Sequence, residues 1–300
     1  MIVNKCSIVV CTFNRLAYLK KCLSSLLDLN FNKYEIIIVN DGSTDDTKKF
    51  LDTLNNDKIK IIHHEYNQGL AVARNTGIKS ANYDFVAFTD DDCVVDKNWL
   101  TELLKGFTDE KVGFVIGQVF YINKNYRGYF PERLVSNLNA QWPMGCNIAY
   151  YKNVFKICGH FDEFFFKYNN EDTEMAIRAI SKGFSFNRCP EAIIYHQAMD
   201  WTVKSLLKSA RNASVWPSLK KKYPNHYLKF GPPIKFNFII NAPDYLFIIL
   251  TPIFIPLLFL RYIVHGKKNL KIFFTKWPIY LFLRRFYIYK EAIQNKKPMI

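Results

Sequence analysis

The sequence predicts an α/β fold built on a largely parallel β-sheet that helices cover on both faces. Short runs rich in Ile and Val alternate with longer stretches whose apolar residues recur at helical spacing. Strands that are apolar throughout are typical of parallel sheets buried on both faces, and their connections are usually helices. A chain of 300 residues can bury a core of this kind. We expect strands at residues 7–11, 35–39, 58–62 and 84–88.

Charge divides the chain at about residue 200. Residues 1–199 contain 23 Lys and Arg against 23 Asp and Glu, whereas residues 200–300 contain 18 against 3. Aromatic and aliphatic residues are also dense in the last third, and this combination suits an anionic lipid surface better than a nucleic-acid groove. We therefore predict a catalytic domain in residues 1–200, followed by a basic, hydrophobic helical appendage in residues 201–300 that associates with a membrane.

The longest apolar run of the appendage does not compel a membrane span. Residues 246–260 are uncharged, but they fall short of the roughly 20 residues that a spanning helix needs. Pro252 and Pro256 interrupt the run, and Lys and Arg flank it on both sides, which removes the asymmetry that orients a single span. We expect a re-entrant or interfacial element, and a buried helical hairpin packed on the catalytic domain is the alternative.

Cysteine usage indicates the compartment. The seven cysteines are scattered and form no Cys-x-x-Cys pair, which favours a reducing environment. Residues 1–15 contain an apolar run of only a few residues and no small-residue cleavage site, so we expect no secretory signal. The predicted location is the cytoplasmic face of the cell membrane, with peripheral or monotopic attachment.

Polar and acidic residues follow the predicted strands, at the sheet edge where such folds bind ligands. They are Thr12, Phe13 and Asn14 after the first strand, Asp41 after the second, and Asp90, Asp91 and Asp92 after the fourth. Three adjacent carboxylates repel one another and raise each other's pKa unless a cation neutralises them. Oxygen ligands favour Mg²⁺ or Mn²⁺, which substrate phosphates often complete. We therefore predict a divalent-metal site, and a solvated acidic turn is the alternative.

Four segments of the chain resemble the inverting family 2 glycosyltransferases of the GT-A fold. They are residues 7–15 (SIVVCTFNR), 35–46 (EIIIVNDGSTDD), 67–78 (NQGLAVARNTGI) and 90–92, which is similar to the D-x-D metal motif. With the later segments described below, the resemblance covers about residues 5–200. It implies a donor half in about residues 1–110 and an acceptor half in about residues 111–200.

The resemblance implies a nucleotide-sugar donor, with a UDP-sugar favoured. Asp41 is expected to accept a hydrogen bond from the base, and Arg74 to approach the diphosphate or the aspartates. The alternatives are an ordinary Asp-Gly turn for Asp41 and a structural salt bridge for Arg74. The implied donor-binding residues are Thr12, Phe13, Asn14, Asp41, Arg74, Asp90 and Asp91.

Later segments are similar to the family's acceptor region. They are residues 144–149, 159–164 and 170–174, although His160 stands where many relatives have a second glycine. The resemblance implies that Asp172 deprotonates the acceptor hydroxyl, while an acidic partner of the helix dipole is the alternative. The implied acceptor-binding residues are Trp142, Gly145, Asn147 and Glu171. For Trp142, packing within the protein is the alternative to contact with the acceptor.

His196 follows an apolar strand predicted at residues 192–195. By the resemblance it completes a metal shell with Asp90 and Asp92, because a neutral imidazole can bind Mn²⁺. A hydrogen-bonded structural histidine is the alternative. The predicted cofactor is Mn²⁺ or Mg²⁺.

The predicted activity is metal-dependent transfer of a sugar from a nucleotide-diphosphate sugar to a hydroxyl of a glycan or lipid-linked acceptor, with inversion, in cell-surface polysaccharide or glycolipid synthesis. A nucleotidyltransferase is the first alternative, but residues 12–14 lack the glycines of a phosphate loop. A non-catalytic membrane or nucleic-acid binder is the second, and it has no evident need for the acidic edge. We expect no nucleic-acid partner, and the oligomeric state, the sugar and the acceptor stay open.

Overall fold

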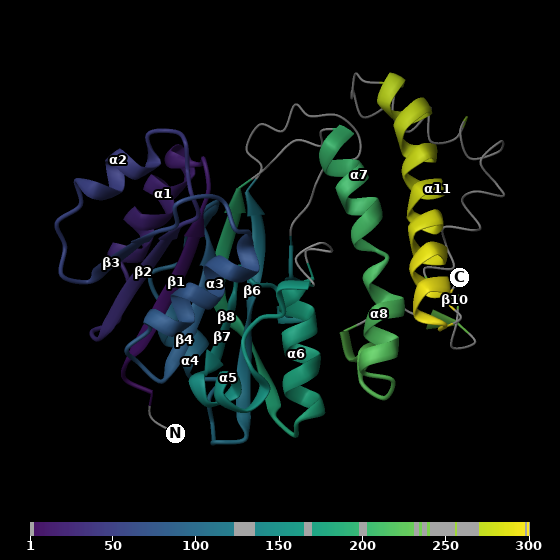
Figure 1. The fold of residues 1–300 in the computed structure, drawn as a ribbon. Helices are drawn as coiled ribbons and strands as arrows, with labels where there is room; N and C mark the ends of the chain where they lie inside the picture. Colours follow the sequence, from purple (N-terminus) through teal and green to yellow (C-terminus); the bar gives the residue numbers. More distant parts are fainter. Residues whose placement is uncertain are drawn as a thin grey trace. The chain divides into compact units, whose positions relative to one another are not determined.

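In a computed structural model of the chain, the apolar runs form neighbouring strands of one mixed sheet (Figure 1). The strand order is β3-β2-β1-β4-β7-β6-β8-β5. The first four strands in this order run parallel, β7 is antiparallel to both of its neighbours, and β5 is antiparallel to β8. The strands are β1 (Cys6–Thr12), β2 (Tyr34–Asn40), β3 (Ile59–His63), β4 (Phe85–Asp90), β5 (Cys93–Val95), β6 (Val112–Ile122), β7 (Ile148–Tyr151) and β8 (Ser185–Gln197).

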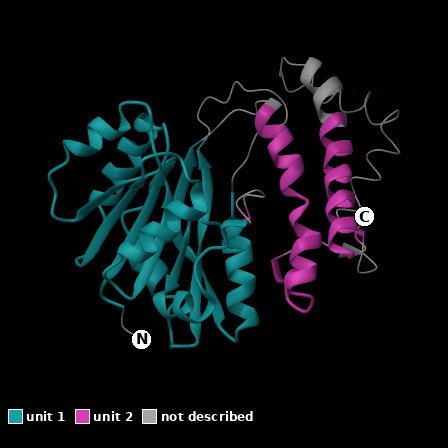
Figure 2. Ribbon diagram, viewed as in Figure 1, with its two compact units in different colours: residues 1–122, 135–166, 171–197 teal, residues 123–134, 167–170, 198–300 magenta. Residues whose placement is uncertain are grey.

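The chain divides into two units (Figure 2). Unit 1 consists of residues 1–122, 135–166 and 171–197, and contains the whole eight-stranded sheet. Unit 2 consists of residues 123–134, 167–170 and 198–300. The structure describes residues 3–122, 136–164, 170–197, 203–230, 234–235, 239–240, 256, 270–297 and 299.

The predicted α/β class is confirmed, and the four strands predicted from the apolar runs correspond to β1, β2, β3 and β4. β-Branched and aromatic residues, which favour strands, occupy most positions of β1, β2 and β4, and both faces of these strands are buried. The helices of this unit are α1 (Leu16–Leu27), α2 (Thr47–Asp52), α3 (Leu70–Ser80), α4 (Trp99–Leu104), α5 (Lys152–Cys158) and α6 (Glu171–Ser181).

Alternate residues of the strands face two different layers of helices. Ile8 and Ile36 belong to one buried cluster with Leu23 of α1 and Trp99 of α4. Val9 lies on the opposite face, where it contacts Gly77 of α3. The sheet is therefore covered on both sides, as the unbroken apolar runs of its strands require.

A cluster of aromatic rings joins the parallel strands to the second half of unit 1. The ring of Phe88 on β4 contacts Tyr150 on β7, Phe155 on α5 and Phe161 in an edge-to-face arrangement, with centroids 5.6 to 6.5 Å apart. Rings in this geometry contribute attraction beyond their buried area. The segment around Phe161, which leads toward α6, is thereby held against the central strands.

The register of the central strands brings their following residues together. Thr12 is opposite Asn40 on β2, and Cys11 is opposite Asp90 on β4. Because all three strands run parallel, the loops that begin at Asn40, Asp90 and after Thr12 leave the sheet at the same edge. This edge is where we place the candidate site.

Unit 2 contains a basic helical segment and a long C-terminal helix. The start of the basic appendage, predicted to be helical from residue 201, contains two helices, α7 (Val203–Asn212) and α8 (Val215–Lys222), and both pack on α11 (Leu270–Asn295). Leu206 and Ala210 of α7 are buried with Tyr280 and Leu281 of α11. The unit also contains the short strands β9 (Ile234–Lys235) and β10 (Ile239–Ile240).

The predicted membrane element lies almost entirely outside the described residues, since of the run 246–260 only residue 256 is described. Among the residues that the structure describes, no helix has both the length and the apolar character needed to cross a membrane.

The contact between α3 and β1 generates a prediction about stability. A Cβ atom on Gly77 would lie 2.4 Å from Cγ1 of Val9, so a side chain here forces the helix away from the sheet. We expect Gly77→Val to lower the free energy of unfolding by about 1–3 kcal/mol, despite the gain in helix propensity that replacing glycine brings. Urea denaturation measures it, with the exposed Lys79→Ala on the same helix as the control. An unchanged stability for Gly77→Val would contradict the close packing.

Candidate active site at the sheet edge

The acidic residues after β4 are held by groups from β1 and from the start of α1. Thr12 Oγ1 donates a hydrogen bond to Asp91 Oδ2 at 2.7 Å. Arg15 Nη1 lies 3.1 Å from Asp91 Oδ1 and 2.9 Å from Asp92 Oδ2, so one guanidinium nitrogen bridges two carboxylates. The polar residue that ends β1 and the acidic residues after β4 therefore meet at one sheet edge, as predicted. Arg15 also belongs to this edge, although it was not among the predicted site residues.

The environment of Asp91 disfavours its charge. Burial raises the pKa of Asp91 to about 6, although the charge of Arg15 and the hydrogen bond from Thr12 act in the opposite direction. The negative charges of Asp92 and Asp90 add to the increase. The tripeptide thus carries more negative charge than its surroundings neutralise, which is the electrostatic condition for binding a cation.

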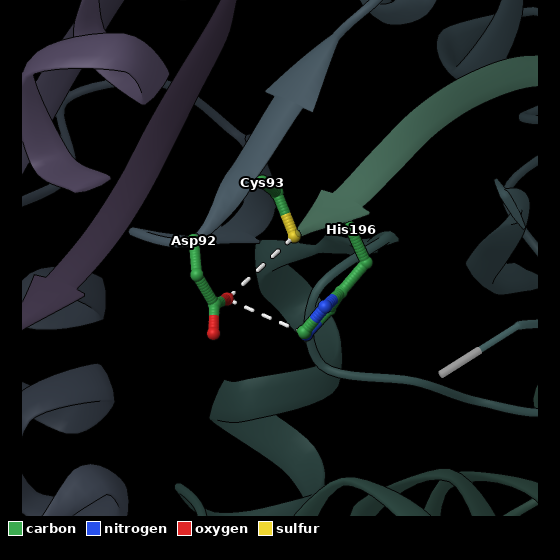
Figure 3. Close-up of side chains that lie close together, drawn as sticks. All are labelled: Asp92, Cys93 and His196. Carbon is green, nitrogen blue, oxygen red and sulfur yellow. Dashed lines mark hydrogen bonds and ion pairs between the residues drawn. The ribbon is translucent and has the colours of Figure 1, made fainter. Parts of the chain in front are cut away.

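Asp92 and His196 come together because β5 pairs with β8 (Figure 3). His196 lies opposite Cys93 in the register, and its Nε2 atom is 3.4 Å from Asp92 Oδ1. The other ring nitrogen, Nδ1, is 2.9 Å from the carbonyl oxygen of Gln197. Since a carbonyl can only accept, Nδ1 carries a proton, and in the neutral ring Nε2 presents its lone pair to the carboxylate.

This donor set fits a divalent cation. Two lone pairs that face each other across 3.4 Å need a proton or a metal ion between them, and carboxylate and imidazole ligands suit Mn²⁺. One ligand atom each from Asp92, Cys93 and His196 lies within 4.8 Å of the others. Burial raises the pKa of the Cys93 thiol well above its usual range, so Cys93 is a poor third ligand for a hard cation.

Asp90, the other expected ligand, faces a different partner. Its Oδ1 atom is 3.2 Å from Nη2 of Arg74, and it is not a member of the Asp92, Cys93 and His196 group. About a third of the Asp90 side chain is exposed, so it is accessible at this edge. Of the three predicted ligands, the structure therefore brings two together and pairs the third with an arginine.

Arg74 connects the acidic edge to the second half of unit 1. Its Nη1 atom lies 2.8 Å from Glu171 Oε1, and the guanidinium is almost completely buried. A Cβ atom on Gly145 would lie within 2.1 to 2.5 Å of the guanidinium, so only glycine leaves room for Arg74 at this place. Gly145 thus acts through its missing side chain, and Arg74 forms the buried ion pair that was the alternative to a direct donor contact.

The Glu-Asp pair at the start of α6 occupies two different environments. Glu171 is buried against Arg74, and its Oε2 atom has no hydrogen-bond partner among the residues that the structure describes. Asp172 is half-buried, with Oδ2 accepting the backbone N–H of Gly145 at 2.8 Å and Oδ1 that of Thr173 at 2.7 Å. Burial raises the pKa of Asp172, which makes it a stronger base than an ordinary carboxylate.

Asp41 is held by three N–H groups. Oδ1 accepts from His64 Nδ1 at 2.7 Å and from the backbone of Gln68 at 3.0 Å, and Oδ2 accepts from the backbone of Gly69 at 2.8 Å. His64 Nε2 is in turn 3.0 Å from Thr76 Oγ1 on α3. His64 was not among the predicted site residues, because its contact with Asp41 spans 23 residues and neither of its neighbours in the chain indicates it.

The loop after β1 is also tied to the loop after β2. Asn14 adopts a left-handed backbone conformation, and its side-chain oxygen accepts the backbone N–H groups of Thr44 and Asp45. Phe13 exposes 41% of its surface at this point. Asn14 therefore shapes the predicted nucleotide pocket by joining two loops, and Phe13 offers an exposed ring.

Asn147 is not at the surface where an acceptor contact was expected. It is completely buried, its Nδ2 donates to the carbonyl oxygens of Gln118 and Ala192, and its Oδ1 accepts the indole N–H of Trp99. Its polar atoms are thus engaged inside unit 1, and we assign it a structural role in place of the acceptor role. Trp142 exposes 42% of its surface and stays a candidate acceptor contact.

The buried pair of Arg74 and Glu171 generates a prediction about pH. Burial raises the pKa of Glu171 to about 7, against an ordinary value of 4.5, although Arg74 opposes the shift. A raised pKa means that the stability contributed by the protonated form is present below pH 4.5 and is lost as the pH rises through 7. Glu171→Gln removes this dependence, so its stability relative to the parent protein should rise over this interval, by on the order of 1–3 kcal/mol. Urea denaturation at pH 5 and at pH 7.5 measures the change, and a difference that falls or stays constant would contradict it.

Comparison with known proteins identifies the family of the domain. The model of glycosyl transferase family 2 matches residues 7–174. The poly-beta-1,6-N-acetyl-D-glucosamine synthase of Staphylococcus aureus is 39% identical over 116 residues, which is 38% of this chain and 28% of that protein. The chain spans between 19% and 42% of the length of the curated relatives it resembles.

Solved structures share the fold. The mannosyltransferase PcManGT from Pyrobaculum calidifontis, in complex with GDP-Man and Mn²⁺, has a TM-score of 0.65 and 14% identity, covering 95% of this chain and 87% of that one. TarS of S. aureus, in complex with UDP-GlcNAc, has a TM-score of 0.55 and 19% identity, covering 75% and 73%. These identities concern the fold alone, whereas the family match covers more than half of the sequence. The chain belongs to glycosyl transferase family 2.

Proposed function

We propose that the protein transfers a sugar from a nucleotide-diphosphate sugar to an acceptor hydroxyl, with inversion at the anomeric carbon and with a divalent cation. The observation that carries this proposal is the connection of the acidic edge to Asp172. Asp90 pairs with Arg74, Arg74 pairs with Glu171, and Asp172 follows Glu171 on α6. Family membership sets aside the nucleotidyltransferase alternative, and the network of charges argues against a non-catalytic binder.

Asp92 and His196 are the residues that would hold the cation, which is Mn²⁺ or Mg²⁺. When bound, it would supply positive charge to the diphosphate that leaves with the nucleotide. Nδ1 of His196, fixed on the carbonyl of Gln197, keeps Nε2 directed at Asp92. Arg15 holds Asp91 and Asp92 in place through its two ion pairs, and at Asp92 it would compete with the cation.

Asp172 is the proposed base. The backbone N–H groups of Gly145 and Thr173 fix its two oxygens, and the hydroxyl of Thr173 also donates to Oδ1 at 3.4 Å. Among the described contacts, Oδ2 therefore keeps an acceptor position for an incoming hydroxyl. Deprotonation by this carboxylate as the acceptor oxygen attacks gives a single displacement, and a single displacement inverts the anomeric carbon. The raised pKa of Asp172 favours this proton transfer.

The chemistry of the relatives supports a nucleotide-sugar donor. One structural neighbour was solved with GDP-Man and another with UDP-GlcNAc, and one curated relative is a synthase of an N-acetylglucosamine polymer. We propose a UDP-sugar as the donor and a glycan or lipid-linked molecule as the acceptor. The proposed process is synthesis of a cell-surface polysaccharide or glycolipid.

We further propose that residues 201–300 attach the enzyme to the cytoplasmic face of an anionic membrane. Residues 200–300 contain 18 basic residues against 3 acidic ones. On α11, Ile279, Phe282, Phe286 and Ile293 are exposed at spacings of three, four and seven residues, which places them on one side of the helix. All seven cysteines are free thiols, which is compatible with a reducing compartment.

Two variants separate metal binding from proton transfer. We expect Asp92→Asn to weaken Mn²⁺-dependent UDP binding by at least about tenfold, because a cation ligand is lost. Asp172→Asn should keep that affinity and lower turnover by about 10²- to 10⁴-fold, because the base is lost. Calorimetry with and without Mn²⁺ measures the binding of UDP. A panel of nucleotide sugars is first screened for the donor, and the release of UDP from that donor then measures turnover.

The exposed carboxylate Asp28, which pairs with Lys97, gives the matched control Asp28→Asn. It should change neither quantity. Equal losses of binding and turnover in Asp172→Asn would show that its role is not that of a base. UDP binding that does not respond to Mn²⁺ in the parent protein would contradict the metal site.

Membrane attachment is tested with vesicles that contain 30% anionic lipid. We expect Phe282→Ser combined with Phe286→Ser to lower the bound fraction by about tenfold, because two aromatic side chains no longer enter the acyl boundary. Co-sedimentation measures binding, with Leu138→Ser combined with Ile157→Ser as an exposed apolar control outside residues 201–300. Binding that is equal for the parent and the α11 variant, or equal for neutral and anionic vesicles, would contradict the proposal.

A further inference from the structure

His64 occupies part of the hydrogen-bonding capacity of Asp41. Asp41 lies directly after β2 at the proposed donor site, and its side chain is almost completely buried. Oδ1 accepts two hydrogen bonds, one from His64 Nδ1 and one from the backbone of Gln68, and Oδ2 accepts one from the backbone of Gly69. A carboxylate offers about four acceptor positions, two on each oxygen. Counting the contacts of the described residues, Asp41 therefore has one position left, and it is on Oδ2.

The arrangement around His64 is rigid. Thr76 on α3 holds the far side of the ring at 3.0 Å, and the side chain of His64 exposes only 8% of its surface. Backbone contacts fix the same loop, since the N–H of His64 donates to the carbonyl of Asn40, and Gly42 approaches the backbone of Tyr66 too closely to carry a Cβ atom. His64 therefore does not swing away to release Oδ1 when a ligand arrives.

Nucleobases differ in what they present to a carboxylate. Uracil offers one ring N–H between two carbonyl groups, which matches one acceptor position. Guanine offers a ring N–H and an amino group side by side, which pair with both oxygens of a carboxylate at once. Cytosine offers a ring nitrogen with a lone pair at the place where uracil has its N–H, and this lone pair repels a carboxylate.

We propose that His64 is a specificity-determining residue that restricts the donor to a uracil-type base by occupying Oδ1 of Asp41. A guanine bound at Asp41 would leave one of its two donors against an oxygen that has no free acceptor position, and an unsatisfied buried donor weakens binding. The inference rests on the proposed function, because it requires that the base of the donor lies at Asp41. It goes beyond that proposal in assigning the choice of base to a histidine outside the family-like motifs.

The test compares the affinities of UDP, GDP and CDP by calorimetry, at one fixed Mn²⁺ concentration. The parent protein should bind UDP at least about tenfold more tightly than GDP. His64→Leu frees the second position on Oδ1, so the ratio of GDP to UDP affinity should rise about fivefold or more. CDP should bind more weakly than UDP in both proteins, because the lone pair of the cytosine ring nitrogen faces the carboxylate of Asp41.

Three further variants make the result specific. His64→Asn keeps an N–H donor near the position of Nδ1 and should keep the preference of the parent protein. Thr76→Val removes only the contact to Nε2 and should also keep it. His63→Leu is the matched control, because among the described residues the ring of His63 bonds to Asn40 and Asp52 and not to Asp41. Thermal denaturation shows whether each variant folds.

Each outcome has a definite meaning. GDP binding as tight as UDP binding in the parent protein overturns the inference and leaves the proposed function standing, whether or not His64→Leu folds. A ratio of GDP to UDP affinity that is the same in folded His64→Leu and in the parent overturns it as well. Absence of binding by all three nucleotides, with and without Mn²⁺, overturns the proposed function and this inference together.

Discussion

The candidate site depends on one buried guanidinium. Arg74 comes from the helix between β3 and β4, and it joins Asp90 at the end of β4 to Glu171 at the start of α6. A buried charge of this kind is stable only when partners surround it, and removing either partner leaves an uncompensated charge. The residues proposed for the donor and the residue proposed as the base are therefore linked through a single side chain. Gly145 makes room for it and also fixes Asp172 through its N–H group.

The electrostatic balance of the edge follows from the same contacts. Arg15 and Arg74 are the two guanidinium groups that pair with its carboxylates, which are Asp90, Asp91, Asp92 and Glu171. Burial raises the pKa values of Asp91 and Glu171 to about 6 and about 7, so these two groups bind protons at a higher pH than ordinary carboxylates do. A bound divalent cation would stabilise the ionised form of these carboxylates, and the negative charge of a nucleotide diphosphate would act in the opposite direction.

The positions of the central strands along the chain were predictable to within two residues, because each is an apolar run, and such runs have few stable alternatives to a buried parallel strand. The gathering of the following residues at one edge of the sheet was predictable as well, because the carboxyl ends of parallel strands meet there. The contacts of His64 and Arg15 were not, because a pairing with Asp41 or Asp91 depends on how loops far apart in sequence meet. Asn147 shows the opposite limit, since a polar residue in a motif does not reveal whether its amide faces a ligand or the interior.

The position of Asn147 has a consequence for how the chain tolerates changes in length. Between Gly117 and Gln118, the pairing of β6 with β8 skips from Cys189 to Ile193, and Asn147 binds the carbonyl of Ala192 inside this bulge. The bulge determines which residue of β8 lies opposite Cys93, and deleting one residue after it would turn His196 to the other face of the sheet. The segment of four residues before His196 must therefore keep its length if the imidazole is to face Asp92.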